Sequence, residues 1–163
     1  MTRVDSSWIL PVVIAGAAAL LTAIVGGTII DLGPWYHSLA QPDWAPPDAA
    51  YGVAWTAIYG CTALAAVTGW RAAPHVRDGE WLIGLYALNG FLNIVWSLLF
   101  FRFQRPDWAL AEVAFLVLSV IALIAACVRY SRAAAALLLP YLAWVLFAGC
   151  LNLAVVRLNG PFA

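Results

Sequence analysis

The sequence predicts an all-α integral membrane protein, with a single domain over residues 1–163 built as a bundle of five transmembrane helices. Three observations predict this fold. The chain is 65% hydrophobic and only 10% charged, whereas soluble domains are about a quarter charged. Its mean hydropathy is +0.91. Five apolar stretches, each near the ~20 residues that a helix needs to cross the hydrocarbon core, occupy nearly all of the chain.

The five stretches are separated by connections that hold nearly all of the charge. Their predicted bounds are 8–30, 49–70, 81–101, 108–128 and 133–156. Their continuous apolarity favours helices over the alternating strands of a membrane barrel, since a helix satisfies its backbone hydrogen bonds internally. The first stretch exceeds the ~7–15 apolar residues of a signal peptide, so we expect it to be a retained span.

The connection over residues 31–48 is predicted to be an ordered cap over one mouth of the bundle. Proline stiffens it, because each proline fixes its own φ and restricts the residue before it. The prolines are Pro34, Pro42, Pro46 and Pro47. The cap also holds amphipathic rings of the kind that sits at the lipid headgroups, namely Trp35, Tyr36 and Trp44. The other connections are short, which makes successive helices antiparallel neighbours.

The charged and metal-binding residue types exclude several functions. Eight arginine and eight acidic residues give a formal net charge of zero, so no basic surface for a nucleic acid is expected. Three cysteines lie inside apolar stretches without the spacing of metal ligands, and we expect buried, inert thiols and no metal site. They are Cys61, Cys127 and Cys150.

Ionisable residues near or inside the spans are few, which argues against ion or proton pumping. Glu112 is the one acidic candidate, and it lies four residues past Trp108, near the end of its span. We expect its carboxyl group to reach the membrane interface. His37 and His75 fall in connections. We expect both to be exposed, with contact between His37 and a ligand or metal as the alternative.

Polar and aromatic side chains share one face on each of three predicted helices. They recur three, four, seven, eight or eleven residues apart, which places them on a common helix face. The sets are Tyr51, Trp55 and Tyr59; Asn89, Asn93, Trp96 and Phe100; and Tyr141, Trp144, Ala148 and Asn152. Ordinary hydrogen bonds between helices would explain any single member. Together the three faces predict a pocket for a large, planar, apolar ligand, with space left at Ala148.

Small residues recur at four-residue intervals on the first two spans, and a third small-residue group lies on the third span. Such residues let helices approach closely in lipid. The sets are Ala15, Ala19, Ala23 and Gly27; Gly52, Thr56 and Gly60; and Gly84, Ala87 and Gly90. They indicate either packing within one molecule or the seam of a homodimer.

Three motifs, in order along the chain, resemble those of the TspO/MBR family, the tryptophan-rich sensory or translocator proteins. The segment WYHSLAQPDWAPPDAAYGVAWTAIY over Trp35–Tyr59 matches W-Y-x-x-L-x-x-P-x-W-x-P-P…W-x-x-x-Y. The segment over Ala87–Phe101 matches L-N-x-x-W-x-x-x-F-F, and the one over Leu137–Asn159 matches P-Y-x-x-W-x-x-F-A-x-x-L-N…L-N. The resemblance covers the whole chain.

The resemblance implies a five-helix membrane protein, usually dimeric, that acts as a sensor, regulator or carrier of porphyrin-type tetrapyrroles such as protoporphyrin IX and haem. It implies no required cofactor and implies binding of synthetic benzodiazepine and isoquinoline ligands. Members of the family occur in bacterial envelopes and in mitochondrial outer membranes, and because no long presequence is seen, a bacterial envelope membrane is the expected location. Leu153 stands where the sterol-recognition pattern has tyrosine, so sterol binding is not predicted. The family's ligand-contacting positions fall on Tyr36, Trp44, Pro47, Trp55, Tyr59, Asn93, Trp96, Trp144 and Ala148.

An enzyme is the alternative that the resemblance leaves open. Some bacterial relatives degrade protoporphyrin IX in light with two facing tryptophans, and the matching residues here are Trp55 and Trp144. Two indoles are also expected in a pocket that only stacks a porphyrin. The sequence therefore predicts binding first and light-dependent catalysis second.

Overall fold

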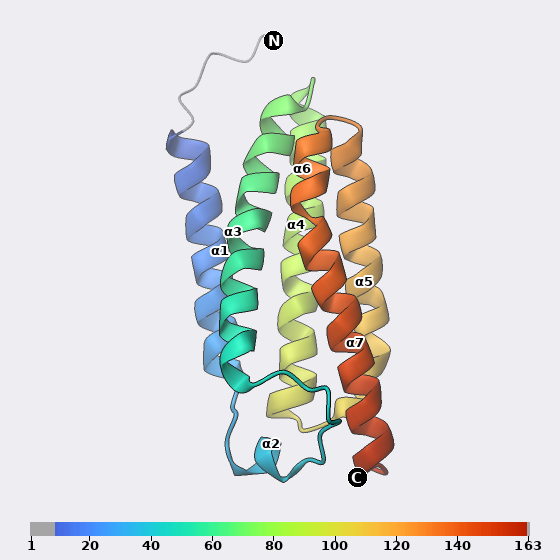
Figure 1. The fold of residues 1–163 in the computed structure, drawn as a ribbon. Helices are drawn as coiled ribbons and strands as arrows, with labels where there is room; N and C mark the ends of the chain where they lie inside the picture. Colours follow the sequence, from blue (N-terminus) through green and yellow to red (C-terminus); the bar gives the residue numbers. More distant parts are fainter. Residues whose placement is uncertain (1–8, 163) are drawn as a thin grey trace.

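The computed structural model describes residues 9–162, and helices with no strand make up the regular structure of this range. Figure 1 shows the long helical rods standing side by side. The elements are α1 (Ile9–Ile29), α2 (Pro34–Ser38), α3 (Asp48–Ala72), α4 (Val76–Ser97), the π-helical segment η1 (Leu98–Arg102), α5 (Pro106–Val128), α6 (Arg132–Leu137) and α7 (Leu139–Asn159).

Four rods are long and apolar enough to cross a membrane within the described residues. They are Asp48–Ala72, Val76–Arg102, Pro106–Val128 and Arg132–Asn159, with hydropathies of 1.4, 1.7, 2.6 and 2.1. The fifth rod is α1, which has 21 residues; the predicted start of its span at residue 8 lies outside the described range. The predicted all-α membrane bundle is confirmed, and the protein is an integral, multi-pass membrane protein.

The spans differ from their predicted bounds by a few residues, and the two clearest departures are explained by polarity and proline. The α4 helix begins at Val76 rather than residue 81, because its first turns carry polar side chains such as Arg77 and Asp78 that extend the helix beyond its apolar stretch. The last rod is interrupted between α6 and α7 at Leu138. Pro140 lies just after this break and has no N–H to continue the backbone ladder.

The end of α4 widens into η1, where the Phe103 N–H donates to the Leu98 carbonyl at 2.8 Å, five residues back. Such π-helical turns are rare and often occur at functional sites. This turn places Phe100 in a buried cluster under the cap, where its ring meets that of Trp35 with centroids 6.0 Å apart.

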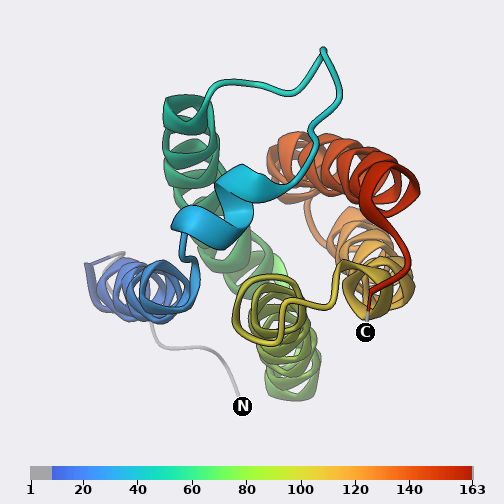
Figure 2. The same cartoon turned by 90° about the horizontal axis from the view of Figure 1, so that it is seen from below.

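The cap crosses one mouth of the bundle, as predicted, and Figure 2 shows α2 lying across the ends of the long rods. The α2 helix itself was not predicted from the sequence, although Pro34 occupies its first position, where proline is favoured. The cap is tied to the last residue of α7: the Asn159 amide donates to the Ala40 carbonyl at 2.9 Å and its oxygen accepts from the Ala40 N–H at 2.8 Å.

We expect Asn159→Ala to loosen the cap without unfolding the bundle. It removes both hydrogen bonds to Ala40, and a net loss of about 1–2 kcal/mol should raise amide exchange at Ala40 about 5- to 30-fold. Hydrogen exchange measured in detergent or nanodiscs checks this. Unchanged exchange at Ala40, or an equal increase throughout α5, would contradict the assignment of Asn159 as a cap anchor.

Large apolar side chains cover the outside of the bundle, as lipid contact requires. Val53 is 73% exposed and Phe91 and Phe115 are each 62% exposed. The prediction of three buried thiols is wrong for Cys150, which is exposed on α7, whereas Cys127 is buried and Cys61 is half-buried. Apolar sequence does not separate the core side of a membrane helix from its lipid side, which explains the error.

Candidate functional site

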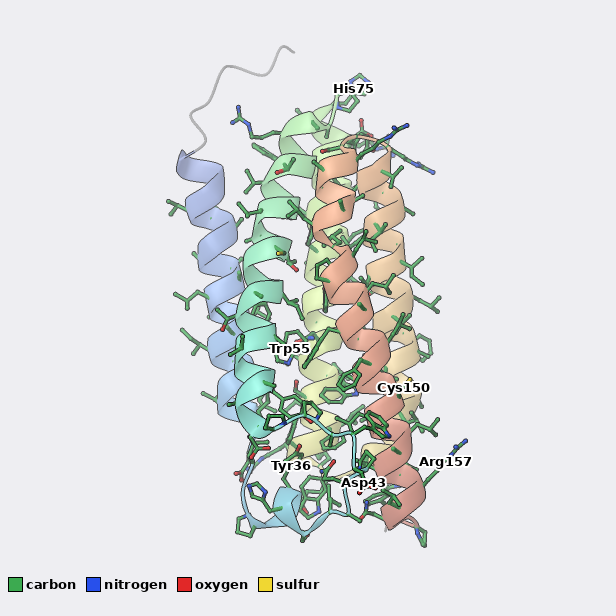
Figure 3. All side chains as sticks on the ribbon, viewed as in Figure 1. Tyr36, Asp43, Trp55, His75, Cys150 and Arg157 are labelled. Carbon is green, nitrogen blue, oxygen red and sulfur yellow. The ribbon has the colours of Figure 1, made fainter. Side chains whose placement is uncertain are left out.

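A cavity of about 550 Å³ lies within the bundle beneath the cap, bounded by α1, α3, α4, η1 and α7. This volume falls within the ~300–1,000 Å³ of typical small-molecule sites. Figure 3 shows Trp55 inside the bundle and Tyr36 at its capped end, with His75 at the opposite end. The cavity therefore lies in the capped half of the molecule.

Most residues predicted to contact a ligand line this cavity. The lining residues that come from the three predicted faces and the cap are Tyr36, Trp55, Tyr59, Asn93, Trp96, Trp144 and Ala148. The faces of α3, α4 and α7 therefore converge, as their periodicity predicted. Trp44 and Pro47 are exposed and are not among the lining residues. Trp44 instead packs its ring on Phe147, a lining residue, with centroids 5.7 Å apart, so their contact with a ligand stays a prediction.

Paired aromatic rings form the walls. Trp55 stacks on Tyr59 with centroids 5.3 Å apart and an interplanar angle of 29°. Trp96 stacks on Phe100 at 5.2 Å and 25°. On α7, Trp144 meets Tyr51 edge to face at 6.0 Å. Each stacked pair follows from an i, i+4 spacing on one helix, so the sequence itself fixes flat apolar surfaces on the α3 and α4 sides.

Few polar side chains line the cavity, and some of them hold atoms without a hydrogen-bond partner. Both amide atoms of Gln41 and the indole nitrogen of Trp96 are buried without a hydrogen-bond partner among the described residues. Burial raises the pKa of the Tyr36 phenol above its ordinary value of 10.0, so this group remains a neutral donor at physiological pH. Asp48 is the charged residue of the described lining. The arrangement suits an apolar ligand with a few polar edges.

Two members of the predicted faces lie deeper, where they hold helices together instead of lining the cavity. Asn89 donates to the Ser119 hydroxyl at 2.8 Å. The amide of Asn93, which does line the cavity, lies 3.5 Å from the Tyr141 phenol oxygen. Asn89 and Tyr141 therefore form ordinary hydrogen bonds between helices, which is the alternative stated above for single members of these faces.

Asn152 both lines the cavity and holds two helices together. It lines the cavity but is only 1% exposed. With its amide oriented to satisfy its neighbours, it donates to the Pro106 carbonyl and accepts from the Leu110 N–H, each at 3.0 Å. It thus binds α7 to the start of α5.

Two residues of the first small-residue ladder line the cavity, which their spacing did not predict. Ala23 and Gly27 of α1 face the cavity beside Gly52 and Thr56 of α3. A Cβ atom added at Gly27, Gly52 or Gly60 would meet nothing within 4 Å. These glycines therefore do not bring two helix backbones into contact within the described chain.

The exposure of His37, His75 and Glu112 was also predicted from the sequence. Both histidines are exposed, as expected, and the Nε2 atom of His37 lies 3.9 Å from an Asp48 carboxylate oxygen. The prediction that the Glu112 carboxyl group reaches the interface is wrong. Glu112 is 8% exposed, because α5 turns this residue toward its neighbouring helices rather than along the bundle surface.

Comparison with known proteins identifies the family. The sequence model of the TspO/MBR family matches residues 9–158. The chain belongs to the TspO/MBR family. It is 38% identical over 130 residues to the tryptophan-rich protein TspO of Chlorobaculum tepidum, covering 77% of this chain and 80% of that protein. It is 35% identical over 129 residues to the TspO of Archaeoglobus fulgidus, with coverage of 77% and 80%. Human translocator protein is 32% identical over 126 residues, with coverage of 77% and 75%.

Proposed function

We propose that this member of the TspO/MBR family binds a porphyrin, most simply protoporphyrin IX, in the cavity beneath the cap and acts as its sensor, regulator or carrier. The observation that carries the proposal is the convergence of stacked aromatic pairs from α3 and α4 with Trp144 of α7 around about 550 Å³ of space. A planar macrocycle can lie against such flat walls with its apolar faces covered.

The polar groups of the cavity support a ligand with polar groups at its rim. Gln41 and Tyr36 lie at the capped end, while Asn93 and the Trp96 indole lie on α4. These groups donate hydrogen bonds without placing a second charge beside Asp48. The carboxyl groups of protoporphyrin IX would find donors near the mouth while its ring occupies the aromatic interior.

The lining favours the metal-free porphyrin over haem. Haem iron in proteins is held by histidine, cysteine, methionine or tyrosine. The described lining contains no histidine, cysteine or methionine, and its tyrosines belong to the aromatic walls or the cap. Stacking and rim hydrogen bonds, rather than axial ligation, would therefore supply the affinity.

We propose binding rather than light-dependent degradation, because stacking already accounts for both tryptophans of the enzymatic alternative. Trp55 stacks on Tyr59, and Trp144 lies against Tyr51 and Phe147.

Synthetic benzodiazepine- and isoquinoline-type ligands, being flat and apolar, are expected to compete for the same walls. The homodimer stays a prediction; Gly84 and Ala87 are exposed on α4 in the manner that a seam between copies requires.

Absorbance of the purified protein with protoporphyrin IX tests the proposal. We expect a shifted porphyrin band and saturable quenching of tryptophan fluorescence, both lost when a flat apolar competitor is added. The shifted band should persist under illumination. An unshifted band with unquenched fluorescence would remove porphyrin binding, and light-dependent bleaching abolished by Trp55→Phe would favour the enzyme instead.

A further inference from the structure

Glu112 is a buried carboxyl group that porphyrin binding leaves unexplained. It is 8% exposed, and neither of its carboxyl oxygens has a hydrogen-bond partner among the described residues. No described basic side chain forms an ion pair with it. An unpaired carboxylate inside a membrane bundle is costly, whereas the neutral acid is tolerated far better.

The register of the helices places Glu112 beside the cavity. Asn89 of α4 bonds to Ser119 of α5, and Glu112 lies seven residues before Ser119 on the same helix face. Because α4 and α5 run antiparallel (Figure 1), the residue opposite Glu112 lies about seven positions after Asn89, at Trp96. The same argument holds on α7, where a Cβ atom at Gly149 would lie 3.6 Å from the side chain of Val113.

Glu112 therefore stands at the level of the cavity, behind the wall formed by Trp96 and by Ala148, the neighbour of Gly149. Both wall residues line the cavity. The Trp96 indole nitrogen also lacks a partner among the described residues. The Trp96 indole N–H and the two Glu112 carboxyl oxygens, all without hydrogen-bond partners among the described residues, thus lie at one level of the bundle interior.

The ionisable groups facing Glu112 are phenols. On α7, Tyr141 is buried in the same apolar cluster as Val113, the neighbour of Glu112. Tyr59 of α3 stacks on Trp55, whose ring also meets that of Tyr141. From α4 come the amides of Asn89 and Asn93. The charged residues of the elements packed on α5 lie at their ends, namely Arg77, Asp78, Glu80, Arg102, Arg132 and Arg157; Asp107 lies in the first turn of α5 and pairs with Arg105.

We propose that Glu112 is a proton-binding site coupled to the cavity. Its carboxyl group carries a proton at neutral pH. It releases this proton to water only when water enters the cavity and reaches Glu112 past the side chain of Trp96. On release the O–H bond breaks, the proton passes to water, and the carboxylate remains in the bundle. The carboxylate needs hydration, and an apolar occupant of the cavity excludes that water. Occupancy of the cavity and protonation of Glu112 therefore favour each other, and the coupling is reciprocal. This site does not depend on which ligand the cavity binds.

Infrared spectroscopy of the ligand-free protein in nanodiscs tests the proton site. Glu80 and Glu112 are the only glutamates of the chain, and Glu80 is exposed in the first turns of α4. In Glu80→Gln with ¹³C-labelled glutamate carboxyl groups, every labelled band belongs to Glu112. We expect a label-shifted band of a protonated acid at neutral pH, absent from Glu112→Gln. A carboxylate band alone in the Glu80→Gln protein would overturn the proposal, and this measurement does not require Glu112→Gln to fold.

Titration of the same band tests the coupling. Ala148→Leu adds apolar atoms inside the cavity and displaces water from it, so the midpoint for loss of the acid band should move to higher pH by about one unit, a tenfold change in proton affinity. Cys150→Leu, which adds a leucine on the exposed side of α7, should leave the midpoint unchanged. An unmoved midpoint in Ala148→Leu would show that Glu112 is isolated from the cavity. Failure of protoporphyrin IX to bind would remove the proposed function and leave both infrared results intact.

Discussion

Ala148→Leu is expected to weaken protoporphyrin IX binding about 10- to 100-fold while leaving the thermal stability of the bundle nearly unchanged. Ala148 lines the cavity between Trp144 and Asn152 on α7, so the added carbons enter the space that the macrocycle would occupy. Forcing a ligand to share a filled site costs about 1–3 kcal/mol. The smaller Ala148→Thr should shift affinity in the same direction by less. Fluorescence-quenching titrations and thermal unfolding measure the two quantities.

Cys150→Leu is the matched control, because Cys150 lies two residues along the same helix and is exposed. We expect its affinity to equal that of the unsubstituted protein. Equal affinities of Ala148→Leu and Cys150→Leu would mean that the cavity is not where the porphyrin binds. A large loss of stability in Ala148→Leu would instead show that the space around residue 148 closes in the membrane.

Gly69→Leu is expected to cost about 3 kcal/mol of the free energy of unfolding, because overpacking at a helix junction forces elements apart. Gly69 of α3 is buried where four helices meet. A Cβ atom there would lie 3.4 Å from the Cys127 sulfur and 3.6 Å from the side chains of both Leu82 and Ala134. One carbon fits these distances, so Gly69→Ala should be neutral or slightly stabilising through its better helix propensity. The branched leucine side chain does not fit.

Gly60→Leu provides the comparison on the same helix. Gly60 is exposed, and a Cβ atom there would meet nothing within 4 Å. Reversible unfolding by added denaturing detergent should therefore give Gly69→Leu a much smaller free energy of unfolding than either Gly69→Ala or Gly60→Leu. A similar loss in Gly60→Leu would place this face of α3 against another copy of the chain.

The elements that sequence alone predicted well are those fixed by local periodicity. The spans follow from apolar length, and the converging faces follow from spacings such as that of Trp55 and Tyr59, which stack as i, i+4 neighbours. The cap was predicted because proline and aromatic residues restrict it, and it is indeed tied to α7 through Asn159. Fold and cavity walls could therefore be read from patterns within single elements.

What the sequence did not give depends on contacts between distant segments. Gln41 is a polar residue in a loop, and only tertiary structure places it in the lining of the cavity and buries its amide atoms. Ala23 and Gly27 were interpreted as packing residues, because a small side chain looks the same against a helix and beside an open space. Glu112 was expected at the interface from its position near a helix start, whereas the rotation of α5 decides its burial.

Indole NMR signals measured during titration with protoporphyrin IX test the central claim most directly, because the ring current of a bound macrocycle shifts nearby protons. Tryptophan-to-phenylalanine variants assign each signal. We predict large shifts for Trp55, Trp96 and Trp144, which line the cavity, and unchanged signals for Trp81 and Trp108, which are 65% and 54% exposed near helix ends. Shifts confined to Trp81 and Trp108, with the three cavity signals unmoved, would contradict binding inside the bundle.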